Sequence, residues 1–377
     1  MKRMRIGLVY IDDPNWTGGS DYVINLINAL NYLPSNEQPE IVLFLSRNTV
    51  ITDLKKKIEY PRYCIHQMLQ ARKALIMSRI FRFFGIGIYK KPFDFIYPMP
   101  KNSSAERYFS FIPLDRRIFW IPDFQEKYFP HLFGEEICEK RNKTRSELTA
   151  QPENTIVLSS DDAKHDLLKF YPNNKAKLKV LRFANTSKWA FSKVDRRALL
   201  AKYQLPDKYF ICPNQFWKHK NHMLVIQAVK HIVDSGGNVC VAFCGKELDP
   251  RAPNHVPQLK QYVSQNGLGD SIRFLGFLDK ADQMALLHFS TAMIQPSFFE
   301  GWSTTIEDGI ALKKLVIASN LGVNQEQLQN LGLYFDPHKS EELAQLLENN
   351  TKRKEIEYQQ NNRVQKFAKT FVNLMGE

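Results

Sequence analysis

The chain has 377 residues, of which 44% are hydrophobic and 12% aromatic. This length exceeds one average domain and predicts two α/β domains, while the apolar content is ample for packed cores and excludes global disorder. No apolar run reaches the length of a transmembrane helix, so we expect a soluble or peripheral protein.

The positive charge is unevenly distributed. The formal net charge is +13, and residues 1–189 contribute +10 of it, from 30 basic and 20 acidic side chains. Such an excess predicts an anionic partner for the first half, namely a bilayer surface, a polyanionic acceptor or nucleic acid; general solubility is the alternative. No nucleic-acid recognition motif accompanies the charge, so nucleic acid is not expected as the main partner.

The five cysteines are scattered and odd in number, which predicts reduced thiols in a cytosolic protein. The basic and apolar start MKRMRIGLVYI breaks at Asp12 and Asp13 and is too short for a secretory signal. We therefore expect a cytoplasmic protein, peripheral on the inner face of the cytoplasmic membrane if it binds lipid.

The first half opens with a βαβ pattern. A strand over Arg5–Ile11 precedes the loop DDPNWTGGS, a helix with Ser20 as its N-cap follows, and a second strand covers Ile41–Leu45. Further apolar runs extend a parallel sheet over Phe93–Tyr97, Ile118–Ile121, Thr155–Leu158 and Leu178–Phe183.

The second half alternates strands and helices and predicts a doubly wound domain. Strands are expected over Tyr209–Cys212, Val239–Cys244, Ile272–Leu275, Ala292–Gln295, Leu315–Ala318 and Leu333–Phe335. Helices are expected over Asn221–Val233, His255–Asn266, Lys280–Phe289 and Ile306–Leu312. Apolar periodicity lapses near Ala184–Asp195, so we expect domains at residues 1–189 and 190–350, with a C-terminal helix in 351–377 that returns to the first.

Loops at the carboxyl edges of two Rossmann-like sheets would line a cleft, and three segments are expected to reach it. The first is Trp16–Ser20, which places Gly18 and Gly19 at a strand-to-helix turn. Glycine lets the backbone approach a ligand, and a helix N-terminus favours negative charge. A tight turn without a ligand explains the pair equally well.

The second segment is NQFWKHKNH, residues 214–222, which follows a strand and opens a helix. Lys218 and Lys220 flank the helix start and form an anion pocket, with Lys220 better placed for a diphosphate. A solvated basic turn is the alternative. Because His219 and His222 lack a third ligand, they are expected to be surface or capping residues, and no metal site is predicted.

The third segment is Pro296–Ser319, which follows an apolar strand and carries Glu300 and Asp308 eight positions apart. Gly301 permits close approach of a ligand carrying hydroxyls and phosphates, such as a sugar nucleotide. Helix-end stabilisation is the alternative role of Asp308 and the neighbouring Glu307. Further N–H and hydroxyl donors come from Ser303, Thr304 and Thr305.

The third segment resembles the retaining GT-B glycosyltransferases of family four, the glycosyl transferases group 1. That family carries a Glu, seven residues, Glu motif, followed by a small-residue helix and a PVIAS-like strand; Glu300 and Asp308 take the two acidic positions. The resemblance covers Phe210 to about Gln327, and NQFWKHKNH together with EGWSTTIED resembles one subgroup. WIPDFQEKYFP and VLSSDDAKHDLLKFYP look like further subgroup signatures. The resemblance to this family implies the GT-B fold, in which two Rossmann-like domains with parallel sheets face each other across a cleft.

The resemblance also implies roles for individual residues. Glu300 would contact hydroxyls of the donor sugar, Asp308 the ribose, and Lys220 the diphosphate. Gly18 and Gly19 would approach the donor phosphates. The other implied donor-site residues are Gln215, Lys218, Phe274 and Gly276 of a base-reading turn, and Gly301, Trp302, Ser303, Thr304 and Thr305 around the sugar and phosphate.

Two departures from the family pattern bear on these roles. The arginine usually found five residues before the phosphate lysine is replaced by Gln215, so Lys218 could supply the missing charge. The family's first-domain histidine aligns with Pro122, which is followed by Asp123. We assign Asp123, as a hypothesis, an electrostatic or acceptor-positioning role.

These observations predict a retaining hexosyltransferase with Glu300, Lys220 and Asp123 as catalytic residues. It would move a sugar from a nucleotide sugar to a glycan or lipid-linked acceptor in cell-surface polysaccharide or lipopolysaccharide synthesis. No Asp-x-Asp metal motif is evident, so neither a metal nor another cofactor is expected. The alternatives are a nucleotide-sugar epimerase or phosphorylase of the same architecture, and a non-catalytic pseudo-glycosyltransferase.

The stretch Arg72–Lys91 mixes basic and aromatic residues. Such a helix could lie on an anionic membrane surface, where a lipid-linked acceptor would be found. A core helix with basic flanks is an equal alternative.

Overall fold

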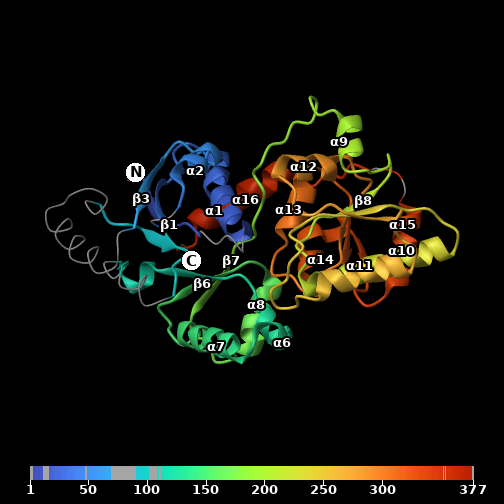
Figure 1. Ribbon diagram of the computed structural model, residues 1–377. Coiled ribbons are helices and arrows are strands. Elements are labelled where there is room, and N and C mark those ends of the chain that lie inside the picture. The colour runs from blue at the N-terminus through green and yellow to red at the C-terminus, as the bar shows by residue number, and fades with distance from the viewer. Residues whose placement is uncertain are drawn as a thin grey trace. The chain divides into compact units, whose positions relative to one another are not determined.

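The computed structural model of the protein describes residues 3–11, 17–46, 49–68, 91–101, 108–109, 112–350, 352 and 354–375. The chain forms two compact units (Figure 1). Unit 1 comprises Met1–Phe124, Glu135–Thr186 and Asn361–Glu377, and unit 2 comprises Gln125–Gly134 and Ser187–Gln360. The short segment Gln125–Gly134 therefore belongs to unit 2, although its sequence neighbours on both sides belong to unit 1.

Unit 1 is built on parallel strands. Its described strands are β1 (Arg5–Val9), β2 (Glu40–Leu45), β3 (Tyr63–Gln67), β4 (Phe95–Tyr97), β5 (Ile118–Ile121), β6 (Thr155–Leu158) and β7 (Lys177–Val180). They form sheets with the orders β3-β2-β1-β4 and β5-β6-β7, and a parallel bridge between Ile96 and Arg117 continues the order from β4 toward β5. β3 was not predicted, because this edge strand has no buried residue and so carries no apolar pattern.

Helices surround these strands, and the last one comes from the far end of the chain. The described helices of unit 1 are α1 (Thr17–Ala29), η1 (Leu30–Tyr32), α2 (Ile51–Lys57), η3 (Leu114–Arg116), α7 (Glu135–Thr149), α8 (Asp161–Phe170) and α16 (Gln360–Val372). The ring of Phe367 in α16 lies 6.0 Å from that of Tyr22 in α1, and Phe371 lies 5.5 Å from Phe95 in β4. The apolar face of α16 thus completes the core of unit 1 (Figure 1).

Unit 2 contains one six-stranded parallel sheet. Its strands are β8 (Phe210–Cys212), β9 (Val241–Phe243), β10 (Ile272–Phe274), β11 (Met293–Gln295), β12 (Val316–Ser319) and β13 (Leu333–Phe335). They lie in the order β10-β9-β8-β11-β12-β13, which is the order of a dinucleotide-binding fold. Phe210 and Cys212 face one hydrophobic cluster and Ile211 faces the other, so β8 is buried on both faces, as is typical of parallel sheets.

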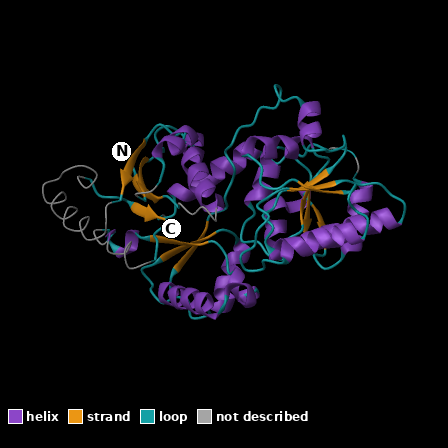
Figure 2. Cartoon of the chain, in the orientation of Figure 1, coloured by secondary structure: helices purple, strands orange, loops and turns teal. Residues whose placement is uncertain are grey.

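Helices lie on both faces of this sheet (Figure 2). The helices of unit 2 are α5 (Gln125–Tyr128), α6 (Pro130–Phe133), α9 (Arg196–Lys202), η4 (Lys218–Lys220), α10 (His222–Asp234), α11 (His255–Gln265), α12 (Lys280–Phe289), α13 (Thr304–Ala311), α14 (Gly322–Leu328), η5 (Gln329–Leu331) and α15 (Ser340–Asn349). The expected α/β class with parallel sheets is confirmed in both units. The predicted strands and helices of the second half are found within a few residues of their expected ends.

Lys314 is a buried lysine that ties α12 to β12. Its side chain is almost fully enclosed, and its Nζ donates to the carbonyl oxygens of His288 at 2.8 Å and Ser290 at 2.6 Å. These carbonyls lie at the C-terminal end of α12, where intrahelical donors are missing and the helix dipole favours a cation. The ammonium therefore satisfies two acceptors that the fold has removed from water.

We expect Lys314→Met to lower the free energy of unfolding by about 3 kcal/mol, because two buried carbonyls lose a charged donor. Equilibrium urea unfolding would measure the loss. Lys313→Met is the matched control: Lys313 is exposed and pairs with the exposed Glu357, so its loss should leave the free energy of unfolding nearly unchanged. Equal stability of the two variants would contradict the capping role.

No helix within the described ranges is both long and apolar enough to cross a membrane. The proposed membrane-binding stretch Arg72–Lys91 lies outside the described residues, apart from Lys91.

Candidate functional site

The strand order of unit 2 brings two loops together at the middle of its sheet. β8 and β11 are neighbours, but the chain leaves β8 toward β9 on one side and β11 toward β12 on the other. The carboxyl ends of two such strands form the edge at which open α/β folds bind ligands. The loops are residues 213–221 and 296–303, and Asn214 links the first loop to the last residue of β11, since its Nδ2 donates to Oε1 of Gln295 at 3.0 Å.

Lys220 and Glu300, predicted from separate motifs, meet at this edge. Lys220 Nζ lies 2.6 Å from Glu300 Oε1, and the same oxygen accepts a hydrogen bond from Gln295 Nε2 at 2.6 Å. The two side chains are only 12% and 8% exposed. Both side chains are charged and little exposed. The ammonium of Lys220 can bind an anionic group of a ligand, and the carboxylate of Glu300 can accept hydrogen bonds from ligand hydroxyls.

The N-terminus of α13 lies directly after Glu300. Ser303 caps the helix, because its Oγ accepts from the N–H of Ile306 at 3.2 Å. Gln327 of α14 then holds Ser303 in place: it accepts from the Ser303 N–H at 3.2 Å and donates to the Ser303 carbonyl at 2.8 Å, and also donates to Glu307 at 2.8 Å. The Ser303 groups expected to hold a ligand are therefore engaged within the protein, and no sequence pattern pointed to Gln327.

Asp308 lies in the second turn of α13 and pairs with a lysine from another helix. Its Oδ2 lies 2.5 Å from Nζ of Lys280 at the start of α12. The Asp308 side chain is 11% exposed, whereas that of Lys280 is 47% exposed. Lys280 was not predicted, because it is separated from Asp308 by 28 residues and only the packing of α12 beside α13 brings them together.

The loop after β8 is held by residues of the loop after β9. Gln215 Oε1 accepts from the N–H of Lys246 at 3.0 Å, and the N–H of Lys218 donates to Asp249 Oδ2 at 2.9 Å, while the Lys218 side chain is exposed. Asp249 also binds Arg251, whose Nε lies 2.9 Å from Oδ1. Burial alone raises the pKa of Asp249, but hydrogen bonds from Arg251 and the two backbone N–H groups outweigh it and leave the pKa below its usual value of 3.8.

The predicted base-reading turn after β10 contacts the same loop through backbone atoms. Gly276 adopts φ +69° and accepts at its carbonyl from the N–H of Gly245 at 2.9 Å. A Cβ at Gly245 would lie 2.2 Å from the carbonyl oxygen of Asn214, so only glycine fits this approach. The Phe274 ring packs on Phe243 at 5.6 Å and is part of the core contacts rather than an open face.

The first-half site residues all lie in unit 1. Gly18 and Gly19 are in the first turn of α1, which begins at Thr17, whereas Trp16 lies outside the described residues. The prediction that Ser20 caps this helix is wrong: Ser20 lies inside it, and its hydroxyl donates to the carbonyl of Ile11 at 2.6 Å. Asp123 follows β5, and its carbonyl accepts from Arg145 at 2.9 Å.

The expectation that His219 and His222 are surface or capping residues is wrong. Both are buried, and the ring of His222 stacks on Phe216 with centroids 4.4 Å apart. Burial lowers the pKa of His222 to about 3 and that of His219 well below 6.5, so both rings are neutral at pH 7. In the part of the chain that the structure describes, no three His, Cys, Asp or Glu residues are grouped to hold a metal ion.

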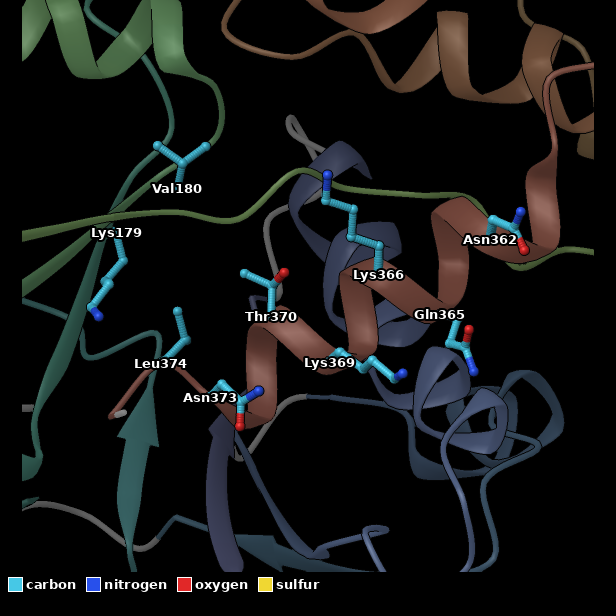
Figure 3. Close-up of a pocket in the computed structure, with 9 residues that line it drawn as sticks. All are labelled: Lys179, Val180, Asn362, Gln365, Lys366, Lys369, Thr370, Asn373 and Leu374. Atoms are coloured by element: carbon cyan, nitrogen blue, oxygen red, sulfur yellow. The ribbon is translucent and has the colours of Figure 1, made fainter. Parts of the chain in front are cut away.

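A cavity of about 510 Å³ lies elsewhere, between β7 and α16 of unit 1 (Figure 3). Its lining includes Lys179 of β7 and, from one face of α16, Lys366 and Lys369. None of the residues predicted to bind a donor lines it. The candidate site is therefore placed by the strand ends of unit 2 and not by this cavity.

Comparisons with known proteins give relatives for the second half of the chain and for its fold. Residues 195–369 match the family model described as Glycosyl transferases group 1. A stretch of 225 residues, 59% of this chain, is 25% identical to the O-antigen chain mannosyltransferase RfbU of Salmonella typhimurium. It covers 55% of that protein, so the chain spans about half the length of this curated relative.

Solved structures match nearly the whole chain. A glycosyltransferase from Rickettsia africae has a TM-score of 0.67 at 18% identity, covering 100% of this chain and 96% of that one. HepE of Anabaena, in complex with UDP and glucose, has a TM-score of 0.63 at 14% identity, covering 98% and 95%. Likeness at this identity shows the fold alone. The chain therefore has the α/β fold of the GT-B glycosyltransferase structures that it matches, and its residues 195–369 are similar to the glycosyl transferases group 1 family.

Proposed function

We propose that this protein is a retaining glycosyltransferase that moves a sugar from a nucleotide sugar to a glycan or lipid-linked acceptor in cell-surface polysaccharide or lipopolysaccharide synthesis. The observation that carries the proposal is the pairing of Lys220 with Glu300 at 2.6 Å, at the junction of β8 and β11. A nucleotide sugar offers a diphosphate for the first group and sugar hydroxyls for the second.

The chemistry needs positive charge where the leaving diphosphate develops its own negative charge. Lys220 supplies this positive charge, and the donor takes the place of Glu300 beside the Lys220 ammonium. The bond between the anomeric carbon and the diphosphate oxygen breaks, the acceptor oxygen bonds to the same face of that carbon, and the acceptor proton passes to the departing phosphate. No side-chain nucleophile is needed, and a bound metal is not required.

The similar proteins support this choice of substrates. The relative from Salmonella typhimurium is an O-antigen chain mannosyltransferase, and HepE was solved with UDP and glucose. We infer a nucleotide-sugar donor for this chain, an acceptor of the polysaccharide or lipid-linked class, and work at the inner face of the cytoplasmic membrane. Asp308 would contact the ribose after partial release from Lys280, and Asp123 would position the acceptor.

A panel of nucleotide sugars in a thermal-shift assay tests the proposal. The true donor at one hundred times its dissociation constant should stabilise the fold by about 2.7 kcal/mol, and related donors should do so less. NMR of the product should then show an unchanged anomeric configuration, and EDTA should leave the rate unchanged. Binding of no nucleotide sugar would instead indicate a non-catalytic protein, and release of a free sugar or sugar phosphate would indicate an epimerase or phosphorylase.

A further inference from the structure

Asp249 and Arg251, in the loop after β9, form a compact ion pair inside unit 2. The Asp249 side chain has no exposed surface, and that of Arg251 is 23% exposed. Arg251 binds the carboxylate with two nitrogens, Nε at 2.9 Å and Nη2 at 3.3 Å, and its own N–H donates to Oδ1 at 3.0 Å. A fork of this kind fixes the orientation of both side chains.

The carboxylate also holds the turn that carries Lys220. Asp249 Oδ2 accepts from the N–H of Lys218 at 2.9 Å, and Lys218 is the first residue of η4. The N–H groups at the start of a helical turn have no partner within it, so this acceptor comes from outside the turn. Two residues later the N–H of Lys220 donates to the carbonyl of Trp217 at 2.8 Å, which closes the turn.

The guanidinium of Arg251 connects this turn to the segment Gln125–Gly134. Its Cζ lies 5.3 Å from the ring centroid of Trp217 and 5.2 Å from that of Phe133 in α6, and Nη1 lies 3.4 Å from Gln125 Oε1 in α5. A cation within about 6 Å of the centroids of two aromatic rings is attracted to both. Arg251 therefore joins the loop after β8 to a piece of chain whose flanking residues belong to unit 1.

The same segment packs against both halves of the Lys220–Glu300 site. The Phe129 ring lies 6.4 Å from that of His219, the residue before Lys220. The Tyr128 ring lies 5.2 Å from that of Phe299, the residue before Glu300. Both site residues are thus bordered by side chains that meet this segment.

We propose that Asp249 and Arg251 are positioning residues that clamp the turn 217–220 onto the segment Gln125–Gly134 and so hold Lys220 in place for the donor diphosphate. The proposal rests on the proposed function of Lys220. Arg251 acts through Lys220 rather than on the donor itself, because its guanidinium already engages Asp249, Gln125 and two rings.

A double-mutant cycle tests the clamp. Arg251→Lys keeps the charge but loses the fork and the stacking, so we expect kcat/KM for the donor to fall about 10- to 100-fold. In a Lys220→Ala background the same change should cost less than about threefold, because the residue through which it acts is gone. The control is Arg196→Lys, since Arg196 pairs with Asp207 on the surface and should change kcat/KM less than about twofold in either background.

A second measurement requires no activity. Protein labelled with 5-fluorotryptophan should show a 19F resonance for Trp217, assigned by its loss in Trp217→Phe, that shifts in Arg251→Lys and not in Arg196→Lys. An unshifted resonance, or losses that multiply fully in the double mutant, would overturn the clamp. Full activity of Lys220→Ala would instead show that the proposed function of Lys220 is wrong.

Discussion

Lys220→Ala is expected to lower kcat by about 10²- to 10³-fold, the loss found when one preorganised donor to a developing anion is removed. Lys220 is 12% exposed and within 2.6 Å of Glu300, so its charge acts in a setting that water screens poorly. Steady-state kinetics with saturating donor would measure the change. We expect the loss to exceed that from any single acid or base substitution, because in the proposed reaction the departure of the diphosphate is the step that needs positive charge.

Lys218→Ala is the matched control for this prediction. Lys218 lies two residues away with an exposed side chain, and its contact with Asp249 is made by the backbone N–H, which alanine retains. We expect kcat to stay within about threefold. A loss as large as that of Lys220→Ala would show that Lys218 supplies the charge that Gln215 does not.

The effect of Lys220→Ala on stability must be separated from its effect on the reaction rate. Removing Lys220 leaves Glu300 buried without its cation, and breaking a buried pair costs about 3–5 kcal/mol of stability. The double variant Lys220→Met/Glu300→Gln removes both charges and should recover most of that stability. It should be at least as slow as Lys220→Ala, because it also lacks the Glu300 carboxylate; recovery of activity along with stability would reduce Lys220 to a structural residue.

Glu300→Gln is expected to affect two ligands in opposite directions. The substitution replaces the charged acceptor of the sugar hydroxyls with a neutral amide. We therefore expect kcat/KM for the nucleotide sugar to fall about 100-fold, equivalent to about 2.7 kcal/mol. The nucleoside diphosphate alone should bind as tightly as before or more tightly, because it no longer competes with a carboxylate for Lys220. Titration calorimetry with both ligands would measure the difference.

The control for Glu300→Gln is Glu357→Gln, which removes the same charge from an exposed pair with Lys313 and should leave both affinities unchanged. A drop of equal size for nucleotide sugar and nucleoside diphosphate in Glu300→Gln would contradict the assignment of Glu300 to the sugar.

The class of fold and the position of Lys220 and Glu300 at one edge of the sheet could be predicted from sequence, because both depend on local patterns. Short apolar runs separated by amphipathic stretches predict parallel strands and helices, and β8 and β11 were found within two such runs. Lys220 lies in the loop that follows β8, and Glu300 lies in the loop that follows β11. Once the runs are identified as parallel strands, their carboxyl ends lie at one edge of the sheet, so both residues were placed there without knowledge of the packing.

Only the tertiary structure decided which other residues the predicted site residues contact. Asp308 with Lys280, Lys218 with Asp249, and Ser303 with Gln327 are separated by 28, 31 and 24 residues, and each pair depends on which helices and loops lie side by side. The burial of His219 and His222 and the packing of Gln125–Gly134 within unit 2 are likewise set by contacts between distant segments. Periodicity and spacing report on neighbours within a few residues along the chain. Ion pairing and burial depend on the distances that folding creates between residues that are far apart in the sequence.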